Sequence, residues 1–227
     1  MEAIILAGGF GTRLQSVVKD VPKPMAPIND KPFLEYVVRY LITNGVNHII
    51  LAVGYKKDSI INYFKDKYWG VPIDYSVEDT PLFTGGAVKK ALSKCCESSV
   101  FIVNGDTYFS VNLKEMYDNH IKNNADLTIA VKQMNNFDRY GTIEIEDNKK
   151  IRCFKEKRYC KTGLINGGIY CLKSKILSQI TDGVFSFEKD YMEKFYQKDK
   201  MYAYISNGYF IDIGVPEDYF EFIEEQI

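Results

Sequence analysis

The chain has 227 residues, of which 29 are basic and 30 acidic, and its formal net charge is −1. This length suits one large domain, or one domain with a small lobe, and is sufficient to bury a substantial core. The balanced charge disfavours nucleic acid and anionic membranes as partners, so any polyanion must be bound by a local group of residues.

Apolar runs and cysteines narrow the cellular setting. The longest apolar runs, such as residues 49–53, are far shorter than the roughly 20 residues that span a bilayer. Residues 1–7 lack the basic region and the cleavage site of a signal peptide. The five cysteines match neither a disulfide framework nor the spacing of a zinc site, so we expect them to be reduced. We therefore predict a cytoplasmic protein that binds no membrane. The sequence leaves the oligomeric state open, with a homodimer as one option.

The first 131 residues predict strands that alternate with helices. Apolar residues recur at helical spacing over 33–42 and stop at Asn44-Gly45, a typical helix end. The predicted strands lie at 4–7, 48–53, 73–77, 100–103 and 127–131, and the predicted helices at 33–42, 58–64, 85–94 and 113–121. Such alternation is typical of an α/β fold with a mostly parallel sheet covered on both faces.

From about residue 132 the pattern changes. Residues 142–145 and 151–154, joined by a turn at Asp147-Asn148, predict an antiparallel hairpin. We expect it to form a small lobe, at about 132–163, within a single domain that covers residues 1–227. The remaining predicted elements are a strand at 164–172, helices at 173–180 and 188–197, a strand at 210–213 and a helix at 217–225.

The first predicted strand runs into a loop, Gly8-Gly9-Phe10-Gly11-Thr12-Arg13-Leu14, and Lys23 follows in Val21-Pro22-Lys23-Pro24. Glycines let backbone N–H groups close on an anion, and Arg13 and Lys23 add full positive charge, so the pattern indicates a phosphate site. The chain has no G-x-x-x-x-G-K-[ST] string, which excludes a P-loop. An NAD-linked oxidoreductase is disfavoured because Leu14 stands where the third glycine of its fingerprint belongs. A bare turn would not require the two cations.

Two carboxylates follow predicted strands far apart in the chain. Asp106 ends Asn104-Gly105-Asp106, and Asp212 lies in the last predicted strand. Since ligands bind at the carboxyl ends of parallel strands, we expect both to reach one place. Two carboxylates beside a polyphosphate suit Mg²⁺, which fills its octahedron with waters and phosphate oxygens. Either aspartate alone would more often be a turn or cap residue.

These segments together resemble the sugar nucleotidyltransferase family. The opening loop resembles its LxxGxGTRL signature with the following Lys-Pro pair, and residues 210–219 resemble its closing D-I-G-T-P-E-D-Y segment. Further matches are residues 78–87 to E-x-x-P-L-x-T-G-G, 103–106 to the first metal-aspartate segment, 154–157 to F-x-E-K and 166–170 to N-x-G-I-Y. Many members have proline after F-x-E-K where this chain has Arg158, which leaves the shape of that loop open.

The resemblance implies a fold and a set of site residues. The fold is the Rossmann-like, three-layer α/β/α nucleotide-diphospho-sugar transferase fold, with the antiparallel lobe on the sugar side. The implied nucleotide-binding residues are Leu6, Ala7, Gly8, Gly9, Gly11, Thr12, Arg13, Glu78, Thr84, Gly85, Gly86, Asn104 and Gly105. The sugar-binding residues are Tyr140, Glu156, Lys157, Asn166 and Gly167, of which Tyr140 is included only for its position at the hairpin. The catalytic residues are Arg13, Lys23, Asp106, Lys157 and Asp212, and the metal ligands for Mg²⁺ are Asp106 and Asp212.

Three of these assignments have plainer alternatives. Glu156 and Lys157 could be a solvated charge run, Asn166 with its glycines could form a strand bulge, and Tyr140 could simply pack. We expect His48 and His120 to be surface residues, since neither sits in a triad-like pattern.

The implied reaction is attack by a sugar 1-phosphate on the α-phosphorus of a nucleoside triphosphate. Its nucleophile is already an anion, so no general base is required. Within the family, the short chain and its motif variants indicate GTP and a heptose 1-phosphate as substrates, with a GDP-heptose product for capsule or other surface glycans. Alternatives are a mannose 1-phosphate guanylyltransferase, an N-acetylmuramate 1-phosphate uridylyltransferase and a non-catalytic regulatory homologue that binds nucleotide sugar.

Overall fold

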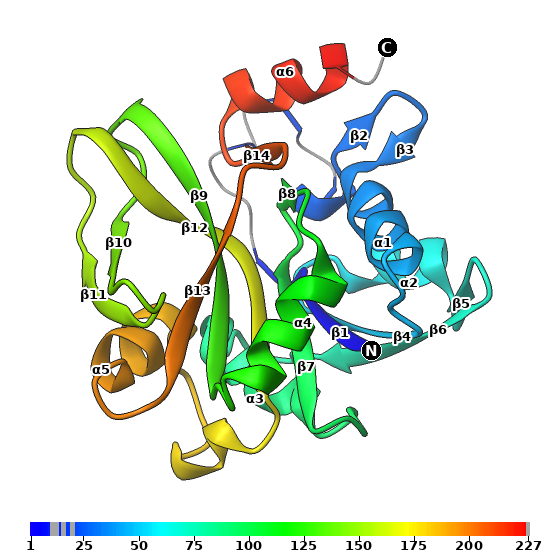
Figure 1. Ribbon diagram of the computed structural model, residues 1–227. Coiled ribbons are helices and arrows are strands. Elements are labelled where there is room, and N and C mark those ends of the chain that lie inside the picture. The colour runs from blue at the N-terminus through cyan, green and yellow to red at the C-terminus, as the bar shows by residue number, and fades with distance from the viewer. Residues whose placement is uncertain (10–13, 15–16, 19–20, 226–227) are drawn as a thin grey trace.

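The fold is built on a mixed ten-stranded sheet. The computed structural model describes residues 1–9, 14, 17–18 and 21–225. The strand order is β11-β10-β12-β7-β1-β4-β6-β5, with β9 paired to β12 and β13 paired to β9 (Figure 1). The strands are β1 (Glu2–Leu6), β4 (His48–Val53), β5 (Lys67–Tyr68), β6 (Val71–Val77), β7 (Ser99–Asn104), β9 (Leu127–Phe137), β10 (Thr142–Ile145), β11 (Ile151–Lys155), β12 (Cys160–Lys173) and β13 (Met201–Ser206).

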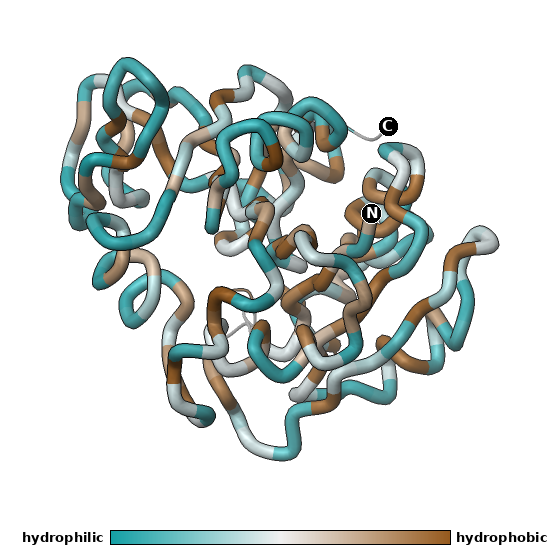
Figure 2. Tube along the Cα trace, turned by 60° about the horizontal axis from the view of Figure 1, so that its bottom comes forward, coloured by the Kyte–Doolittle hydropathy of each residue, from teal (hydrophilic) through white to brown (hydrophobic). Residues whose placement is uncertain are grey.

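The strands β7, β1, β4 and β6 form a parallel core. Side chains alternate between the two faces of this core: Ile5 packs into one hydrophobic cluster and Ile4 into the other. Helices α1 (Phe33–Thr43), α2 (Lys57–Phe64), α4 (Leu113–Lys122) and α6 (Pro216–Glu225) contribute to the first cluster, and α3 (Phe83–Leu92) and η4 (Phe187–Met192) to the second. The predicted three-layer α/β fold is confirmed, and Figure 2 shows apolar residues concentrated along the interior segments.

Local signals explain where several of these elements begin and end. The first long helix, α1, follows Pro32 and ends before Asn44 and Gly45. Gly45 has φ +86°, a left-handed conformation that glycine adopts without a steric penalty. Asn112 caps α4 by accepting a hydrogen bond from the backbone N–H of Glu115 at 3.1 Å.

The predicted antiparallel hairpin is present at one end of the sheet. β10 pairs with β11, and β12 pairs with both β10 and β9, all in antiparallel register. In Figure 1 this region lies at the opposite end of the molecule from β5. It joins the parallel core through β12, which pairs antiparallel with β7.

Two expectations for the C-terminal third are wrong in detail. The predicted helix at 173–180 is only a short 3-10 turn, η3 (Ile176–Gln179), and the predicted helix at 188–197 is the π-helix η4 followed by a single turn, α5 (Glu193–Phe195). The wider turn of η4 buries Phe187, Tyr191 and Met192 together in the second cluster. Helical periodicity in the sequence does not separate α from π turns.

The last predicted strand also pairs differently from expectation. β14 (Phe210–Asp212) does not join the ten-stranded sheet. It pairs antiparallel with β8 (Thr107–Phe109), and in this pairing Asp212 lies opposite Thr107. Asp212 is therefore held by this two-stranded ribbon and not by the end of a parallel strand. A second small ribbon joins β2 (Pro27–Ile28) to β3 (Lys31–Pro32).

His120 corrects the expectation that both histidines lie at the surface. It lies on the buried face of α4 and is only 1% exposed, and its Nδ1 lies 2.9 Å from Thr128 Oγ1 on β9. Burial lowers the pKa of His120 to about 4, so the ring is neutral at physiological pH. His48 is partly exposed and lies between the carboxylates of Glu2 and Asp74.

Among the described residues, no helix is both long and apolar enough to cross a membrane.

Candidate active site

Two adjoining cavities open on the side of the sheet where β1 and β7 end. The larger has a volume of about 560 Å³ and the smaller about 310 Å³, and Asn104 and Glu188 line both. Of the predicted nucleotide-binding and catalytic residues, the larger cavity is lined by Leu6, Gly8, Gly9, Lys23, Glu78, Thr84, Asn104 and Asp106. Of the predicted sugar-binding and catalytic residues, the smaller is lined by Tyr140, Glu156, Lys157, Asn166 and Asp212. The two predicted groups thus occupy two neighbouring hollows.

Not every predicted residue reaches these cavities. Ala7, Gly85, Gly86, Gly105 and Gly167 are not among the described residues that line them. Gly11, Thr12 and Arg13 lie outside the described residues, so their predicted roles remain sequence-based.

Gly8 is closely packed where the glycine-rich loop leaves β1. A Cβ added to Gly8 would stand 2.7 Å from Glu78 Oε1 and 3.3 Å from the backbone nitrogen of Gly54. The other carboxylate oxygen of Glu78 accepts a hydrogen bond from the Leu82 N–H at 3.0 Å. Partial burial raises the pKa of Glu78, although the Leu82 N–H acts in the opposite direction.

The two predicted metal aspartates converge on one cation. Lys23, the first residue of η2 (Lys23–Met25), places its Nζ 2.6 Å from Asp106 Oδ2 and 3.4 Å from Asp212 Oδ1. The Lys23 side chain is only 7% exposed. Burial, and then the nearby Asp106 carboxylate, raise the pKa of Asp212, whereas Lys23 and the Gly214 N–H lower it. The expected convergence is confirmed, although Asp212 arrives by the β8–β14 ribbon.

The donor set at this point is small. Among the described residues, no group of three or more histidine, cysteine, aspartate or glutamate side chains could hold a metal ion. Two carboxylates with open positions are unsuited to Zn²⁺, which takes three or four protein ligands. They suit Mg²⁺, which needs only one or two carboxylates when phosphate and water oxygens complete its shell.

Gly85 and Gly86 pack α3 against the 183–185 segment. Their N–H groups both donate to the carbonyl oxygen of Phe185, at 2.9 and 3.3 Å. An added Cβ on Gly85 would clash with the Phe185 ring, and one on Gly86 with the Gly183 carbonyl. These glycines therefore fix the position of the helix whose first turn borders the larger cavity.

A bulge in β12 shapes the smaller cavity. The register with β9 shifts between Asn166 and Tyr170, so the bulge reading of this motif is confirmed. Asn166 holds the bulge from both ends, because its Nδ2 donates to Tyr170 Oη at 2.9 Å and its Oδ1 accepts from the Gly168 N–H at 3.0 Å. Gly168 has φ +73°. Asn166 also lines the cavity, so the bulge and a ligand contact are compatible.

Charged and aromatic side chains surround the mouth of the smaller cavity. Glu156 and Lys157 follow β11 and are exposed. The Tyr140 ring meets Phe210 edge-on at 6.1 Å between centroids, and the Arg139 guanidinium lies over it. Tyr140 thus packs and also borders the cavity.

Sequence reasoning missed several residues that line the cavities, and two of them matter most here. Glu188, in η4, lines both cavities and accepts hydrogen bonds from Thr84 Oγ1 at 2.7 Å and Ser186 Oγ at 3.0 Å. Phe83, at the start of α3, lines the larger cavity. A lone glutamate in a helical segment and a lone phenylalanine inside a motif carry no signal that would single them out.

Comparisons with known proteins agree with this arrangement. The family model described as "Nucleotidyl transferase" matches residues 2–226. The chain is 51% identical over 220 residues to a D-glycero-alpha-D-manno-heptose 1-phosphate guanylyltransferase from Aneurinibacillus thermoaerophilus, covering 96% of this chain and 95% of the relative. It is 49% identical over 224 residues to the protein of the same name from Campylobacter jejuni, covering 98% and 99%.

A solved structure shares the whole fold. The crystal structure of HddC from Yersinia pseudotuberculosis complexed with GMP-PN matches with a TM-score of 0.90 and 39% identity, covering 100% of this chain and 99% of that one. The family match spans nearly the full length of the chain. This chain therefore belongs to the nucleotidyl transferase family.

Proposed function

We propose that this chain transfers GMP from GTP to D-glycero-alpha-D-manno-heptose 1-phosphate, giving GDP-heptose and pyrophosphate. The observation that carries the proposal is the junction of two cavities at Lys23, Asp106 and Asp212. A reaction between two phosphate-bearing substrates requires two binding hollows that meet at a charged point. Two relatives of about half identity bear the name of this activity.

The proposed chemistry is a displacement at phosphorus. A phosphate oxygen of the sugar phosphate forms a bond to the α-phosphorus of GTP, and the bond from that phosphorus to the bridging oxygen of the β-phosphate breaks. Pyrophosphate leaves with the electron pair. The nucleophile is already deprotonated, so the enzyme has to align two mutually repelling anions and neutralise the charge on the leaving group. No step of this reaction needs a general base, which agrees with His120 being buried and neutral.

The larger cavity would hold the nucleotide. The backbone at Gly8 and Gly9 and the Lys23 ammonium would contact its phosphates, together with Arg13 as the sequence resemblance implies. The Glu78 carboxylate would accept hydrogen bonds from the N1–H and the amino group of guanine, because an ionised carboxylate is a pure acceptor. Thr84, tied to Glu188, would hold the wall of the cavity in place.

The smaller cavity would hold the sugar phosphate. Lys157 would attract its phosphate, and Glu156 and Asn166 would bind sugar hydroxyls. The cavity also contains the Tyr140 ring, which offers an apolar surface to the face of a sugar.

The residues at the junction fit a magnesium ion. Lys23 already stands between the two carboxylates as a cation, at 2.6 and 3.4 Å, so the pair has the charge and spacing to attract positive charge. Asp106 and Asp212 would hold Mg²⁺, whose contribution is to neutralise charge on the phosphates. Lys23 would then exchange its carboxylate partners for phosphate oxygens and steady the α-phosphate.

The proposal extends to the cellular setting. All five cysteines are free thiols, which supports a reducing compartment such as the cytoplasm. A nucleotide-activated heptose is a donor for glycosyl transfer, so the product would be consumed in building a capsule or another surface glycan.

Pyrophosphate release tests the proposal. The purified chain is assayed with Mg²⁺ over the four common nucleoside triphosphates, each combined with heptose, mannose or N-acetylmuramate 1-phosphate. We expect the highest kcat/KM for GTP with the heptose phosphate. A preference for UTP would overturn the guanylyl assignment, and a preference for mannose 1-phosphate would move the chain to that relative's activity. Binding of nucleotide sugar without any turnover would identify a regulatory homologue.

A further inference from the structure

Phe83 stands out among the residues that line the larger cavity. Its side chain is 65% exposed, although it is a large aromatic group. Its backbone has φ +58°, in the left-handed region that bulky residues rarely adopt. Both features are unfavourable for a residue whose only function is to fold, and residues held in such conformations concentrate at functional sites.

The neighbouring residues enforce this conformation. On the N-terminal side, the Leu82 N–H is held by Glu78 and the Leu82 carbonyl accepts from the Phe185 N–H at 3.2 Å. On the C-terminal side, Thr84 Oγ1 donates to Glu188 and accepts from the Phe187 N–H at 2.9 Å. The backbone at Phe83 is therefore fixed by contacts before and after it.

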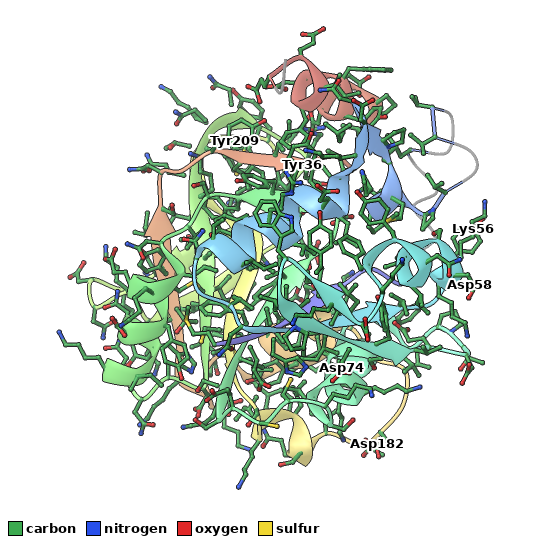
Figure 3. All side chains as sticks on the ribbon, turned by 90° about the vertical axis from the view of Figure 1, so that its right-hand side faces the viewer. Tyr36, Lys56, Asp58, Asp74, Asp182 and Tyr209 are labelled. Carbon is green, nitrogen blue, oxygen red and sulfur yellow. The ribbon has the colours of Figure 1, made fainter. Side chains whose placement is uncertain are left out.

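A longer contact ties the same helix to the loop beneath it. Lys89, in α3, forms an ion pair with Asp182 at 2.7 Å. Figure 3 shows Asp182 at the outer edge of the molecule. This ion pair lies in the later part of α3 and at the surface, so the position of Phe83 depends on the contacts of Leu82 and Thr84.

Trp69 provides a comparison within the same chain. It is 55% exposed and has φ +47°, so it shares both features of Phe83. The protein covers its ring, however: the Arg39 guanidinium lies 4.4 Å from the ring centroid, and the Tyr68 ring stacks at 6.2 Å. Among the described residues, Phe83 has no such ring or cation partner, and it lines a cavity instead.

We propose that Phe83 stacks on the nucleobase of the bound nucleotide and so contributes affinity that favours a purine. This inference rests on the proposed function, because it takes the larger cavity to be the nucleotide site. Aromatic side chains stack on the face of a base, and they do so with every kind of base. A purine offers a larger face than a pyrimidine.

The position of Phe83 agrees with a base and not with phosphates. Glu78 connects the two parts of the cavity wall, since its Oε1 approaches Gly8 and its Oε2 accepts from Leu82. Lys23 and the two aspartates that it pairs with belong to other elements. The carboxylates near Phe83 are those of Glu78 and Glu188, which hold Leu82 and Thr84. Phe83 therefore adds an uncharged, flat surface beside the residue that we assign to the guanine edge.

The test measures stability and ligand affinity separately in the full chain. Phe83→Gly removes both the ring and the left-handed strain, so the melting temperature should rise by about 2–4 °C. The Kd for GTP, measured by calorimetry, should increase roughly tenfold, while the Kd for inorganic tripolyphosphate, which has no base, should not change. Phe83→Tyr should retain the GTP affinity, and Phe83→Leu, which is apolar but not aromatic, should lose most of it. Trp69→Gly serves as the matched control and should leave the Kd for GTP unchanged.

The outcomes separate this inference from the proposed function. If the wild-type chain binds GTP and Phe83→Gly binds it equally well, stacking is refuted and the proposed function stands. If the wild-type chain prefers another nucleoside triphosphate and Phe83→Gly weakens that ligand, stacking stands and the guanylyl assignment falls. If no nucleoside triphosphate binds, both are refuted. A change of oligomeric state in Phe83→Gly with unchanged affinity would identify Phe83 as a contact between copies of the chain and overturn the inference.

Discussion

The nucleotide side and the sugar side of the proposed site are built from different kinds of structure. The larger cavity is bordered by segments that follow the parallel strands β1, β6 and β7, where glycines and backbone groups set the shape. The smaller cavity lies among antiparallel strands and is lined by exposed charged side chains such as Glu156 and Lys157. Lys23 connects them, because it pairs with Asp106 of the larger cavity and Asp212 of the smaller.

This difference has a consequence for mutation. Where packed backbone forms the cavity wall, a substitution that adds volume should disturb the packing. Where exposed side chains form the wall, a substitution that removes a charge should weaken the binding of substrate. Changes on the nucleotide side should therefore affect stability as well as binding. Changes of exposed residues on the sugar side should affect substrate affinity and leave the fold intact.

The largest expected effect is at the junction of the two sides. Asp106→Asn removes a carboxylate that faces Lys23 at 2.6 Å, and the rate of pyrophosphate release should fall by about 10² to 10³. The far-ultraviolet circular dichroism spectrum should stay that of the wild type. Asp118→Asn, which removes an exposed carboxylate paired with Lys114 on α4, is the control and should keep full activity. Near-normal turnover in Asp106→Asn would refute a junction built on this carboxylate.

The second effect concerns the support of the sugar side. His120 packs beneath β9, which pairs with β12, and its pKa is lowered by burial from 6.5 to about 4. The unfolded chain binds this proton more readily than the folded one, so stability is greatest above pH 6.5. It should decline by about 3 kcal/mol as the pH falls from 6.5 to 4.

Urea unfolding at several pH values measures this decline. In His120→Leu the contribution of the imidazole is removed, so the free energy of unfolding should change less between pH 6.5 and 4 than in the wild type. If the free energy of unfolding changed equally with pH in the two proteins, His120 would not control acid stability.

Third, the sugar side should respond to lost charge alone. Lys157→Met should raise KM for the sugar 1-phosphate by about 10- to 100-fold, because a charge-assisted contact is lost, and leave KM for GTP and the melting temperature unchanged. Lys161→Met removes an exposed lysine that is not among the lining residues and should behave as the wild type. An equal rise in KM for both substrates would contradict the division into two sides.

The smallest effects test packing on both sides. Gly85→Ala places a methyl group against the Phe185 ring, and Gly167→Ala places one against the Phe109 ring. Each should lower the free energy of unfolding by about 1–3 kcal/mol. Gly85→Ala should also weaken GTP binding, because it displaces the helix that carries Phe83 and Thr84.

Gly9→Ala is the control for these packing changes, since an added Cβ there meets no described atom within 4 Å. Its free energy of unfolding should stay near that of the wild type. If Gly85→Ala left both stability and GTP affinity unchanged, the nucleotide side would not depend on packed backbone as we infer.

Local patterns in the sequence predicted much of this molecule. The alternation of apolar runs predicted the parallel core, and the bulge that the structure contains at Asn166 was the plainer alternative to the sugar-binding assignment of that motif. Asp106 and Asp212 were expected to meet, and both contact Lys23. These features could be predicted because periodicity, glycine and turn residues act within a few positions of the chain.

Other features depend on contacts between distant parts of the chain. Glu188 enters the site because η4 packs against α3, and its partner Thr84 lies 104 positions earlier in the sequence. His120 is buried because β9 covers it, and Asp212 is placed by pairing with β8. The sequence by itself determined which groups were available, namely the glycines and charged residues on which the phosphate and sugar predictions rest and the two carboxylates. Only the tertiary structure decided which side chains share a cavity, because burial and long-range pairing leave no local pattern in the residues that they bring together.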